Sequence, residues 1–445
     1  MELQFLGAAG TVTGSCYVLS DDSKKVMIDC GFFQGSKELE SLNSKAFATD
    51  PRSIDFLLLT HAHLDHCGRL PKLVKDGFSG PIYLTEPTKR ILEITLVDAA
   101  RVYREHNQEN SLFNEDDVAK TLSLCQVVEY DSEFGPSDFR INYKNAGHIL
   151  GSAFIQLDLS GHKVTFSADL GNSPQELIEP TDEPSSASTI ILESTYGDRV
   201  HQVQDTDGEL SKHIAAIAKD AGTLMIPSFS IERTQELLFR LDRIDKAGKL
   251  DHSVSVFMDS PMAQKVTDVF RDFPEYYNQR LHQAASVDDP FSFPSLKVTR
   301  GSKDSRNIAT TTGPKIIIAG SGMMNGGRIV NHAKTYLPLS NTRLLFVGFQ
   351  AEGTLGRQLL EGQRRVTIDG QPIEVNAQIF DLAGLSSHAD QPKLVNWAKK
   401  TGAQNIILTH GEDYARKGLA EKLVEQTGSK NIQTPHYLDK IMLPL

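Results

Sequence analysis

Metal-binding side chains crowd the end of one predicted strand, in the stretch LLLTHAHLDHCG at residues 57–68. Three histidines and one aspartate occupy six positions directly after a short apolar run. Because side chains alternate along a strand, His61 and His63 point the same way while the chain stays extended, and they form one ligand pair. Asp65 and His66 follow a change of direction and form a second pair. The stretch therefore predicts two metal ions; the competing interpretation is a polar turn that carries surface histidines.

The ligand types indicate which metal to expect. Imidazole together with carboxylate suits zinc, with manganese or iron as alternatives, and a catalytic site keeps a position open for water. Further ligands must come from elsewhere in the chain. Three candidates each follow or end an apolar segment, a placement that lets them meet at one edge of the sheets: His148, Asp169 and His410. A lone histidine after a strand is more often a satisfied polar residue, but the shared placement favours ligands.

The alternation of apolar runs with helix-like segments indicates an α/β architecture. Residues 3–31, with their Gly and Asp turns, look more like antiparallel hairpins than βαβ units, so we expect a mixed sheet or two sheets. The predicted strands are 25–31, 55–61, 163–171, 188–197, 223–230, 314–322, 343–350 and 405–412, and the predicted helices include 86–106, 233–248 and 391–402.

Length and composition bound the class of protein. A chain of 445 residues predicts two domains, or one large core with an insertion. The 39% hydrophobic and 23% charged content is typical of a soluble globular protein. No apolar run approaches the roughly 20 residues that cross a bilayer, and the N-terminal residues do not resemble a secretory signal. We therefore expect a cytoplasmic protein without a membrane partner.

The charge balance limits how the chain can meet a nucleic acid. A formal net charge of −11 argues against non-specific binding through a broadly basic surface. It leaves room for a local basic groove, and bound divalent metal can reverse the sign of a site.

The four cysteines have no paired spacing and are expected to be reduced thiols: Cys16, Cys30, Cys67 and Cys125.

The metal-ligand pattern resembles that of the metallo-β-lactamase superfamily, whose fold is an αββα sandwich with a binuclear metal site between its sheets. Asp29 in MIDCG matches the family's first motif, and HAHLDH matches its histidine cluster. The resemblance implies that Asp169 bridges the metals and that Asp29 orients the site from the second shell; the alternative for Asp29 is a strand-end turn residue. The implied ligands are His61, His63 and His148 for the first metal, and Asp65, His66 and His410 for the second.

Three later motifs resemble those of the β-CASP subfamily. Glu193 in ILESTYGDR resembles motif A, His388 in LSSHAD resembles motif B, and His410 in LTHGE supplies motif C. The stretches between motifs A and B look like the inserted β-CASP domain. The implied organisation is a metallo-β-lactamase domain in two parts, 1–203 and 373–445, around an inserted α/β β-CASP domain at 204–372. NHAK carries a single histidine, His332, where many relatives show two, so its role stays open.

The resemblance implies a ribonuclease related to the endonuclease subunit of the cleavage and polyadenylation specificity factor. Two divalent ions would activate a water, and His388 would protonate the leaving ribose oxygen, with Glu193 keeping it protonated. The competing interpretations are a surface or capping carboxylate for Glu193 and a helix N-terminal polar residue for His388. Endonucleolytic and 5′-exonucleolytic cleavage use the same groups, so the mode stays open.

Two glycine- or serine-rich stretches are candidate phosphate or RNA contacts. In AGSGMMNGGR the backbone near Ser321 and Gly322 could approach phosphate oxygens, with Arg328 adding charge. The alternative is a tight turn packed against the partner domain. In PSFSIERTQ, at the start of a predicted helix, the candidates are Ser228, Ser230 and Arg233, with simple helix capping by Ser230 as the alternative.

Two other functions compete with the ribonuclease. One is a binuclear metallohydrolase of a small ester, thioester or lactone, in which the insertion is only a lid. The other is a catalytically silent RNA-binding subunit, which would lack metal ligands that this sequence retains. The expected partner is single-stranded RNA. The preference for RNA over DNA rests on the resemblance alone. A homo-oligomer is possible, and the oligomeric state stays open.

Overall fold

The computed structural model describes residues 1–21, 23–106, 112–136, 139–159, 161–201, 205–382, 385–429 and 431–444. Its contacts divide the chain into two compact units. The discontinuous unit combines Met1–Val200 with His388–Leu445, and the inserted unit spans His201–Ser387. The division at residues 203 and 372, drawn from sequence motifs, stays a prediction. Within the described ranges, no helix is both long and apolar enough to cross a bilayer.

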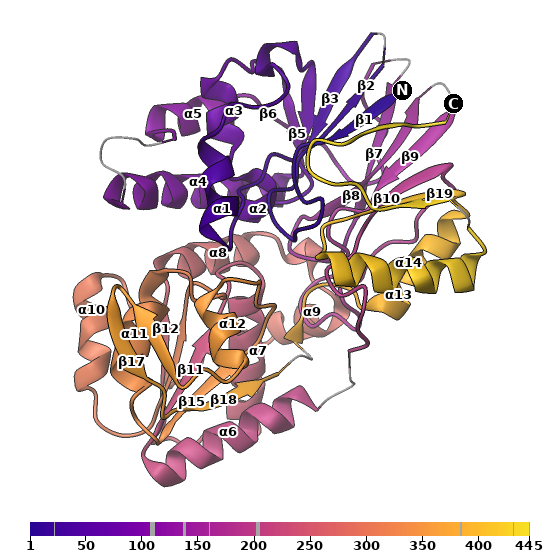
Figure 1. The fold of residues 1–445 in the computed structure, drawn as a ribbon. Helices are drawn as coiled ribbons and strands as arrows, with labels where there is room; N and C mark the ends of the chain where they lie inside the picture. Colours follow the sequence, from indigo (N-terminus) through magenta and orange to yellow (C-terminus); the bar gives the residue numbers. More distant parts are fainter. Residues whose placement is uncertain are drawn as a thin grey trace. The chain divides into compact units, whose positions relative to one another are not determined.

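The discontinuous unit contains two sheets (Figure 1). Their strand orders are β21-β1-β2-β3-β4-β5-β6 and β20-β19-β10-β9-β8-β7. β1 to β3 pair antiparallel and β3 to β6 pair parallel, which confirms the mixed sheets predicted from the hairpin-like start of the chain. The first sheet consists of β21 (Lys440–Met442), β1 (Glu2–Phe5), β2 (Tyr17–Ser20), β3 (Lys25–Ile28), β4 (Phe56–Leu58), β5 (Ile82–Leu84) and β6 (Cys125–Val127). The second consists of β20 (Asn431–Gln433), β19 (Asn405–Thr409), β10 (Thr189–Glu193), β9 (His162–Phe166), β8 (Ala153–Leu159) and β7 (Phe139–Asn145).

Alternate residues of these strands build the core between the two sheets. Leu3 and Phe5 of β1 are fully buried in the same apolar cluster as Ile155 and Leu157 of β8. This spacing of two follows from the pleat of a strand, which turns every second side chain to the same face. The two sheets therefore pack face to face as a sandwich.

Helices cover the outer faces of the sandwich (Figure 1). Leu394 and Trp397 of α13 and Leu419 of α14 pack with Ile190 of β10 and Leu408 of β19. The result is an αββα arrangement, which confirms the predicted fold class. The helices of this unit are α1 (Lys37–Glu40), α2 (Leu64–Cys67), α3 (Leu70–Lys75), α4 (Glu86–His106), α5 (Glu115–Ser123), α13 (Gln391–Thr401) and α14 (Asp413–Thr427).

The inserted unit is built on a parallel six-stranded sheet with the order β13-β12-β14-β11-β15-β18. Strands β11 and β14 are buried throughout, and β12 is buried except at its first residue, as expected for a parallel sheet covered on both faces. The strands are β11 (Thr223–Pro227), β12 (Ser255–Asp259), β13 (Leu296–Val298), β14 (Lys315–Ala319), β15 (Thr342–Phe346) and β18 (Gln378–Asp381), with a separate hairpin of β16 (Arg365–Ile368) and β17 (Gln371–Glu374). The helices are α6 (Thr206–Asp220), α7 (Arg233–Lys246), α8 (Pro261–Asp272), α9 (Gln279–Ala285), α10 (Ser302–Asn307), α11 (Gly327–Tyr336) and α12 (Leu355–Leu360).

Several strands end earlier than the apolar pattern predicts, and they end at candidate site residues. β3 stops at Ile28 because Asp29 adopts a left-handed conformation, with φ of 57°. His410 after β19 has φ of 47°, and Ala168 before Asp169 has φ of 48°. Side chains with a Cβ rarely adopt this region, and the strain is typical of functional sites. These turns redirect the chain where its polar side chains must converge.

Candidate metal centre

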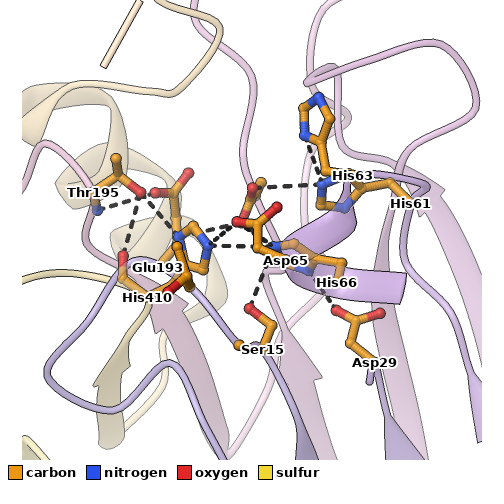
Figure 2. Close-up of polar contacts among 12 residues, drawn as sticks. Ser15, Asp29, His61, His63, Asp65, His66, Glu193, Thr195 and His410 are labelled. Carbon is orange, nitrogen blue, oxygen red and sulfur yellow. Dashed lines mark hydrogen bonds and ion pairs between the residues drawn. The ribbon is translucent and has the colours of Figure 1, made fainter. Parts of the chain in front are cut away.

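The histidine cluster spans the change from an extended chain to a single helical turn. His63 is still extended, with φ of −67° and ψ of 146°, and it precedes α2. His61 and His63 therefore lie on the extended part, whereas Asp65 and His66 lie on the turn (Figure 2). The predicted change of direction between the two ligand pairs is present.

The first group of candidate ligands surrounds one oxygen of Asp169. Its Oδ2 lies 3.6 Å from His61 Nε2 and 3.5 Å from His148 Nε2. His63 Nδ1 lies 3.1 Å from the Nε2 atoms of both His61 and His148. One ligand atom from each of these four residues lies within 4.8 Å of the others, which is close enough to share a cation.

The second group faces the other oxygen of Asp169. Oδ1 lies 3.3 Å from His66 Nε2 and 3.5 Å from His410 Nδ1. His66 Nε2 lies 3.3 Å from His410 Nε2, and Asp65 Oδ2 lies 3.4 Å from the same His410 atom. Asp169 thus presents one oxygen to each group of candidate ligands.

Buried side chains hold the histidines of both groups. Asp29 Oδ2 lies 2.7 Å from His66 Nδ1, which leaves Nε2 directed at the other ligands. Thr60 donates its backbone N–H to Asp29 Oδ1 over 2.8 Å, and its hydroxyl lies 3.0 Å from His61 Nδ1. Asp29 is only 1% exposed. Fixing the second ring nitrogen in this way sets the tautomer and the orientation of a ligating imidazole.

Sequence reasoning missed three of these supporting residues. Thr195 Oγ1 lies 3.0 Å from His410 Nδ1, and Ser15 Oγ lies 3.3 Å from His66 Nε2 (Figure 2). Thr60 is the third. In the sequence, Thr60 stands directly before the histidine cluster and Thr195 stands two residues after Glu193. These positions beside motifs are the signals that could have identified the two threonines. Ser15 carried none.

Glu193 and His388 lie beside the ligand groups. Glu193 ends β10 and is 1% exposed; Oε1 accepts the N–H of Leu170 over 2.8 Å and Oε2 that of Thr195 over 3.2 Å. His388 Nδ1 lies 3.3 Å from Glu193 Oε1, and its Nε2 lies 3.9 Å from Asp169 Oδ2. The side chain of His388 is 15% exposed. The alternative of a surface carboxylate for Glu193 is therefore wrong.

Burial and neighbouring charges set the protonation of the histidines. Burial lowers the pKa of His61 well below its ordinary value and that of His63 to about 4, so both are neutral and able to ligate a metal. Burial also opposes the charged form of His388, but the carboxylates of Glu193 and Asp169 outweigh it and raise the pKa of His388.

The donor set fits divalent metal ions. Asp169 is 1% exposed, and within the described residues its ion-pair partners are all histidines. A buried carboxylate surrounded by imidazoles, without a lysine or arginine, is typical of a site whose positive charge comes from bound cations. The seven predicted ligands all belong to groups whose ligand atoms lie within 4.8 Å of one another, and His388 forms a further such group with Asp169 and His410. The seven are His61, His63, Asp65, His66, His148, Asp169 and His410.

The predicted phosphate contacts lie in the inserted unit, and their role stays a prediction. Ser228 Oγ lies 3.0 Å from Thr234 Oγ1. Ser230 does not cap α7, because Oγ lies 3.1 Å from Ser260 Oγ and the residue at the cap position is Glu232. The backbone N–H of Ser321 donates to Gly326 O over 3.3 Å, so Ser321 and Gly322 belong to a tight turn.

Both predicted arginines have carboxylate partners. Arg233 is buried and pairs with Glu236. Arg328 Nη1 donates to Asp259 Oδ1 over 2.6 Å, and His332 Nε2 lies 2.6 Å from Asp259 Oδ2. The interactions of Arg328 and His332 with one buried carboxylate give His332 a structural role that the sequence left open.

Three family models match the chain. The Metallo-beta-lactamase superfamily matches residues 9–196, the Beta-Casp domain matches 234–359, and the Zn-dependent metallo-hydrolase RNA specificity domain matches 372–435. The order of these matches is the order of the motifs in the sequence.

The chain is also similar to curated proteins. It is 34% identical to "Ribonuclease TTHA0252" of Thermus thermophilus, over 93% of this chain and 94% of that protein. It is 31% identical to "Transcription termination factor FttA" of Pyrococcus horikoshii and 27% identical to "Cleavage and polyadenylation specificity factor subunit 3" of Dictyostelium discoideum. The matches cover 62% and 56% of those two longer proteins.

A solved structure shares the fold alone. "Crystal Structure of a Protein of Unknown Function from Enterococcus faecalis V583" aligns with a TM-score of 0.57 at 10% identity, and the alignment covers 99% of both chains.

Proposed function

Because the chain belongs to the β-CASP branch of the metallo-β-lactamase superfamily, we propose that it is a metal-dependent ribonuclease that hydrolyses RNA phosphodiester bonds. The observation that carries this proposal is Asp169 between two groups of candidate ligands, with the His388–Glu193 pair beside them. A small-ester hydrolase would have no use for an RNA specificity domain. A silent RNA-binding subunit would have no reason to keep seven ligands together.

The metal ligands are assigned from the two groups. We assign the first ion to His61, His63 and His148, the second to Asp65, His66 and His410, and we assign Asp169 to both, with zinc as the native metal and manganese as the alternative. When bound there, two divalent ions supply Lewis-acid activation of a water and neutralise charge on the phosphoryl oxygens. The low pKa of His61 and His63 supports this assignment, because no proton has to leave before they ligate.

His388 is assigned as the general acid. Its Nδ1 faces Glu193, so the proton on Nε2 points toward the ligand groups, where the leaving oxygen of the ribose would lie. Two backbone N–H groups fix Glu193, which in turn fixes the ring of His388. The raised pKa of His388 favours the imidazolium form, and its 15% exposure allows it to regain a proton from solvent.

The setting of the reaction is part of the same proposal. We place the enzyme in the cytoplasm and take its substrate to be single-stranded RNA, whose backbone can enter a site without unwinding. The RNA-binding residues proposed in the inserted unit are Ser228, Ser230, Arg233, Ser321, Gly322 and Arg328. A native-mass measurement distinguishes a single chain from a homo-oligomer.

The deciding experiment uses end-labelled and circular RNA with zinc or manganese and then with chelator. We expect cleavage that requires metal and stops with chelator. Cleavage of circular RNA identifies an endonuclease. Release of single nucleotides from linear RNA, with circular RNA left intact, identifies an exonuclease. If no RNA is cleaved with any divalent metal, the ribonuclease assignment is wrong.

Removing the hydroxyl of Thr195 should weaken the binding of one metal. Its Oγ1 lies 3.0 Å from His410 Nδ1, so Thr195→Val removes one of the contacts that orient the ring while the volume is nearly unchanged. Loss of such a contact typically lowers metal affinity about 10–100-fold. Competition with a chromophoric chelator measures this affinity, and Thr195→Ser, which keeps the hydroxyl, is the matched control. Equal affinities of the valine and serine variants would exclude a positioning role.

Removing the charge of Glu193 should move the pH profile of cleavage. Glu193 raises the pKa of His388, so the wild-type enzyme keeps its acid protonated to higher pH. In Glu193→Gln that pKa falls, and the decline of kcat/KM on the alkaline side should therefore begin at lower pH. The measurement is kcat/KM against pH with metals saturating. An unchanged alkaline limb would mean that another group is the acid.

A further inference from the structure

Three exposed cations follow the edge strand of the parallel sheet in the inserted unit. They lie between the end of β13 at Val298 and the end of α10 at Asn307. We call Arg300, Lys303 and Arg306 the α10 cations. All three are exposed, and within the described residues none of their side chains forms an ion pair. Residues 299–307 contain three cations and one carboxylate, a net charge of +2 in a chain whose formal net charge is −11.

Most of the other arginines in this unit have a carboxylate partner, with Arg343 and Arg364 among those that form no ion pair within the described residues. Seven others each form an ion pair with a carboxylate: Arg233, Arg240, Arg243, Arg271, Arg328, Arg357 and Arg365. Lys297 lies just before the α10 cations and contacts β12, where its Nζ lies 3.0 Å from Ser255 Oγ. The α10 cations are therefore a local excess of positive charge that the rest of the unit does not neutralise.

The only carboxylate of the segment is occupied by backbone groups. Asp304 Oδ2 accepts the N–H of Arg300 over 3.1 Å and that of Gly301 over 3.2 Å. These bonds close the N-terminus of α10 and use the carboxylate as a cap rather than as a partner for a cation. The positive side chains are left to solvent, or to an anionic ligand.

A buried aspartate, Asp259, anchors the segment by accepting hydrogen bonds from two of its hydroxyl groups. Ser305 Oγ donates to Asp259 Oδ2 over 2.6 Å, and the hydroxyl of Thr299 donates to the other oxygen of the same carboxylate. Asp259 is 0% exposed. Arg328 and His332 contact it as well, so its negative charge is balanced inside the fold and does not offset the α10 cations. Because the backbone is held at both ends, less conformational freedom is lost when a ligand binds.

The surface suits a phosphate backbone better than a protein partner. Residues 299–310 expose no large apolar side chain, whereas a specific protein interface has an apolar or aromatic centre. Arginine matches phosphate oxygens with two parallel N–H donors, and exposed Ser302 and Asn307 add polar groups of the kind that contact phosphate and sugar. Lys303 and Arg306 are three apart on the helix and share one face.

We propose that the α10 cations form an RNA-binding surface of the inserted unit that holds the sugar-phosphate backbone of single-stranded RNA without reading its sequence. The proposal rests on RNA being the substrate, as proposed above. It names a contact separate from the metal centre and from the six phosphate contacts predicted from the sequence. Binding through such contacts releases counterions and weakens as salt rises.

The test measures binding of fluorescein-labelled polyadenylate to the full chain in the presence of chelator, so that no cleavage occurs. The variant Arg300→Gln/Lys303→Gln/Arg306→Gln is compared with Lys219→Gln/Lys249→Gln/Lys265→Gln. The control removes the same charge from three exposed lysines of the same unit for which the described residues offer no ion pair. Equal net charge in the two variants separates local contacts from the general field of the protein.

Loss of three phosphate contacts should reduce the slope of log affinity against log salt by about 2 and weaken binding about tenfold or more at low salt. The control should keep the wild-type slope. Equal affinities and slopes for the two variants would overturn the proposal. So would a labelled polyglutamate that binds the wild-type chain as tightly as RNA and loses the same affinity in the α10 variant, because the surface would then recognise acidic protein.

The two proposals fail in different ways. If the wild-type chain binds polyadenylate through the α10 cations but cleaves no RNA with any metal, the ribonuclease assignment fails and the surface stands. If it cleaves RNA with metal while the α10 variant binds as tightly as the control, the surface fails and the ribonuclease assignment stands.

Discussion

Replacing His388 with alanine should reduce RNA cleavage by about 10²–10⁴-fold while both metal ions stay bound. The expected loss is large because general acid catalysis of ribose departure depends on one proton, which we assign to Nε2 of this residue. Its Nδ1 lies 3.3 Å from Glu193 Oε1 and its Nε2 lies 3.9 Å from Asp169 Oδ2. Because His388 also groups with Asp169 and His410 as a possible ligand, the experiment must separate an acid from a ligand. Single-turnover cleavage with metals saturating measures the chemical step, and elemental analysis counts the metals.

The matched control is His436→Ala, which removes an exposed histidine of the same unit. It should leave both cleavage and metal content unchanged. A substrate with a better leaving group than ribose needs less help from an acid, so it should recover much of the activity lost in His388→Ala. If His388→Ala keeps wild-type turnover, the proton comes from elsewhere; if it loses metal, His388 is a ligand, as its contact with Asp169 would allow.

His410→Ala should lose one of the two metal ions and most of the activity. His410 contributes a ring to the second group only, and its Nε2 lies 3.3 Å from His66 Nε2 and 3.4 Å from Asp65 Oδ2. Without it, that group keeps two residues of its own and a share of Asp169, too few donors for a closed zinc site. Elemental analysis after gel filtration should fall from about two metal ions per chain to about one.

Two comparisons sharpen this prediction. Thr195→Val keeps all ligands and should retain both ions at saturating metal, so a lower count in His410→Ala reports the ligand rather than its surroundings. His148→Ala should lose the other ion, because His148 belongs to the first group. Full metal content in His410→Ala would refute the assignment of the second site.

Much of the metal centre could be predicted because its information is local. The cluster follows a short apolar strand, and the period of two along an extended chain is enough to pair His61 with His63. The end of the strand and the start of a single helical turn then separate Asp65 and His66. The part that needed the family resemblance was the grouping of ligands remote in sequence, above all the place of Asp169 between the two groups.

The supporting hydroxyls could not be predicted, because they depend on strand register. Thr195 reaches His410 only because β10 and β19 pair in parallel, with Glu193 opposite Thr409. No local pattern states which residue of one strand lies beside which residue of another, when the two are separated by more than 200 positions. The same reason explains Ser15, whose hydroxyl contacts His66 from a segment 51 positions earlier in the chain.

The inserted unit shows the limit of motif reasoning about charge. Arg233 and Arg328 looked available for phosphate in the sequence, yet each has a carboxylate partner, and that of Arg328 lies 69 positions away. Three cations of this unit that form no ion pair within the described residues, Arg300, Lys303 and Arg306, stand in no motif. Whether an arginine is free depends on the folded neighbourhood, which residue type and spacing do not reveal.

The pairing of β10 with β19 also explains how the chain can carry an inserted unit between two segments that both contribute to the active site. Residue-by-residue hydrogen bonding from Thr189–Asn405 to Glu193–Thr409 fixes the ends of both strands, and Ser194 N–H donates to His410 O over 3.2 Å. The chain that leaves after β10 and returns before α13 can therefore vary in length and content while the catalytic geometry stays the same. A centre with this architecture can acquire new substrates by changing the insertion, without rebuilding its chemistry.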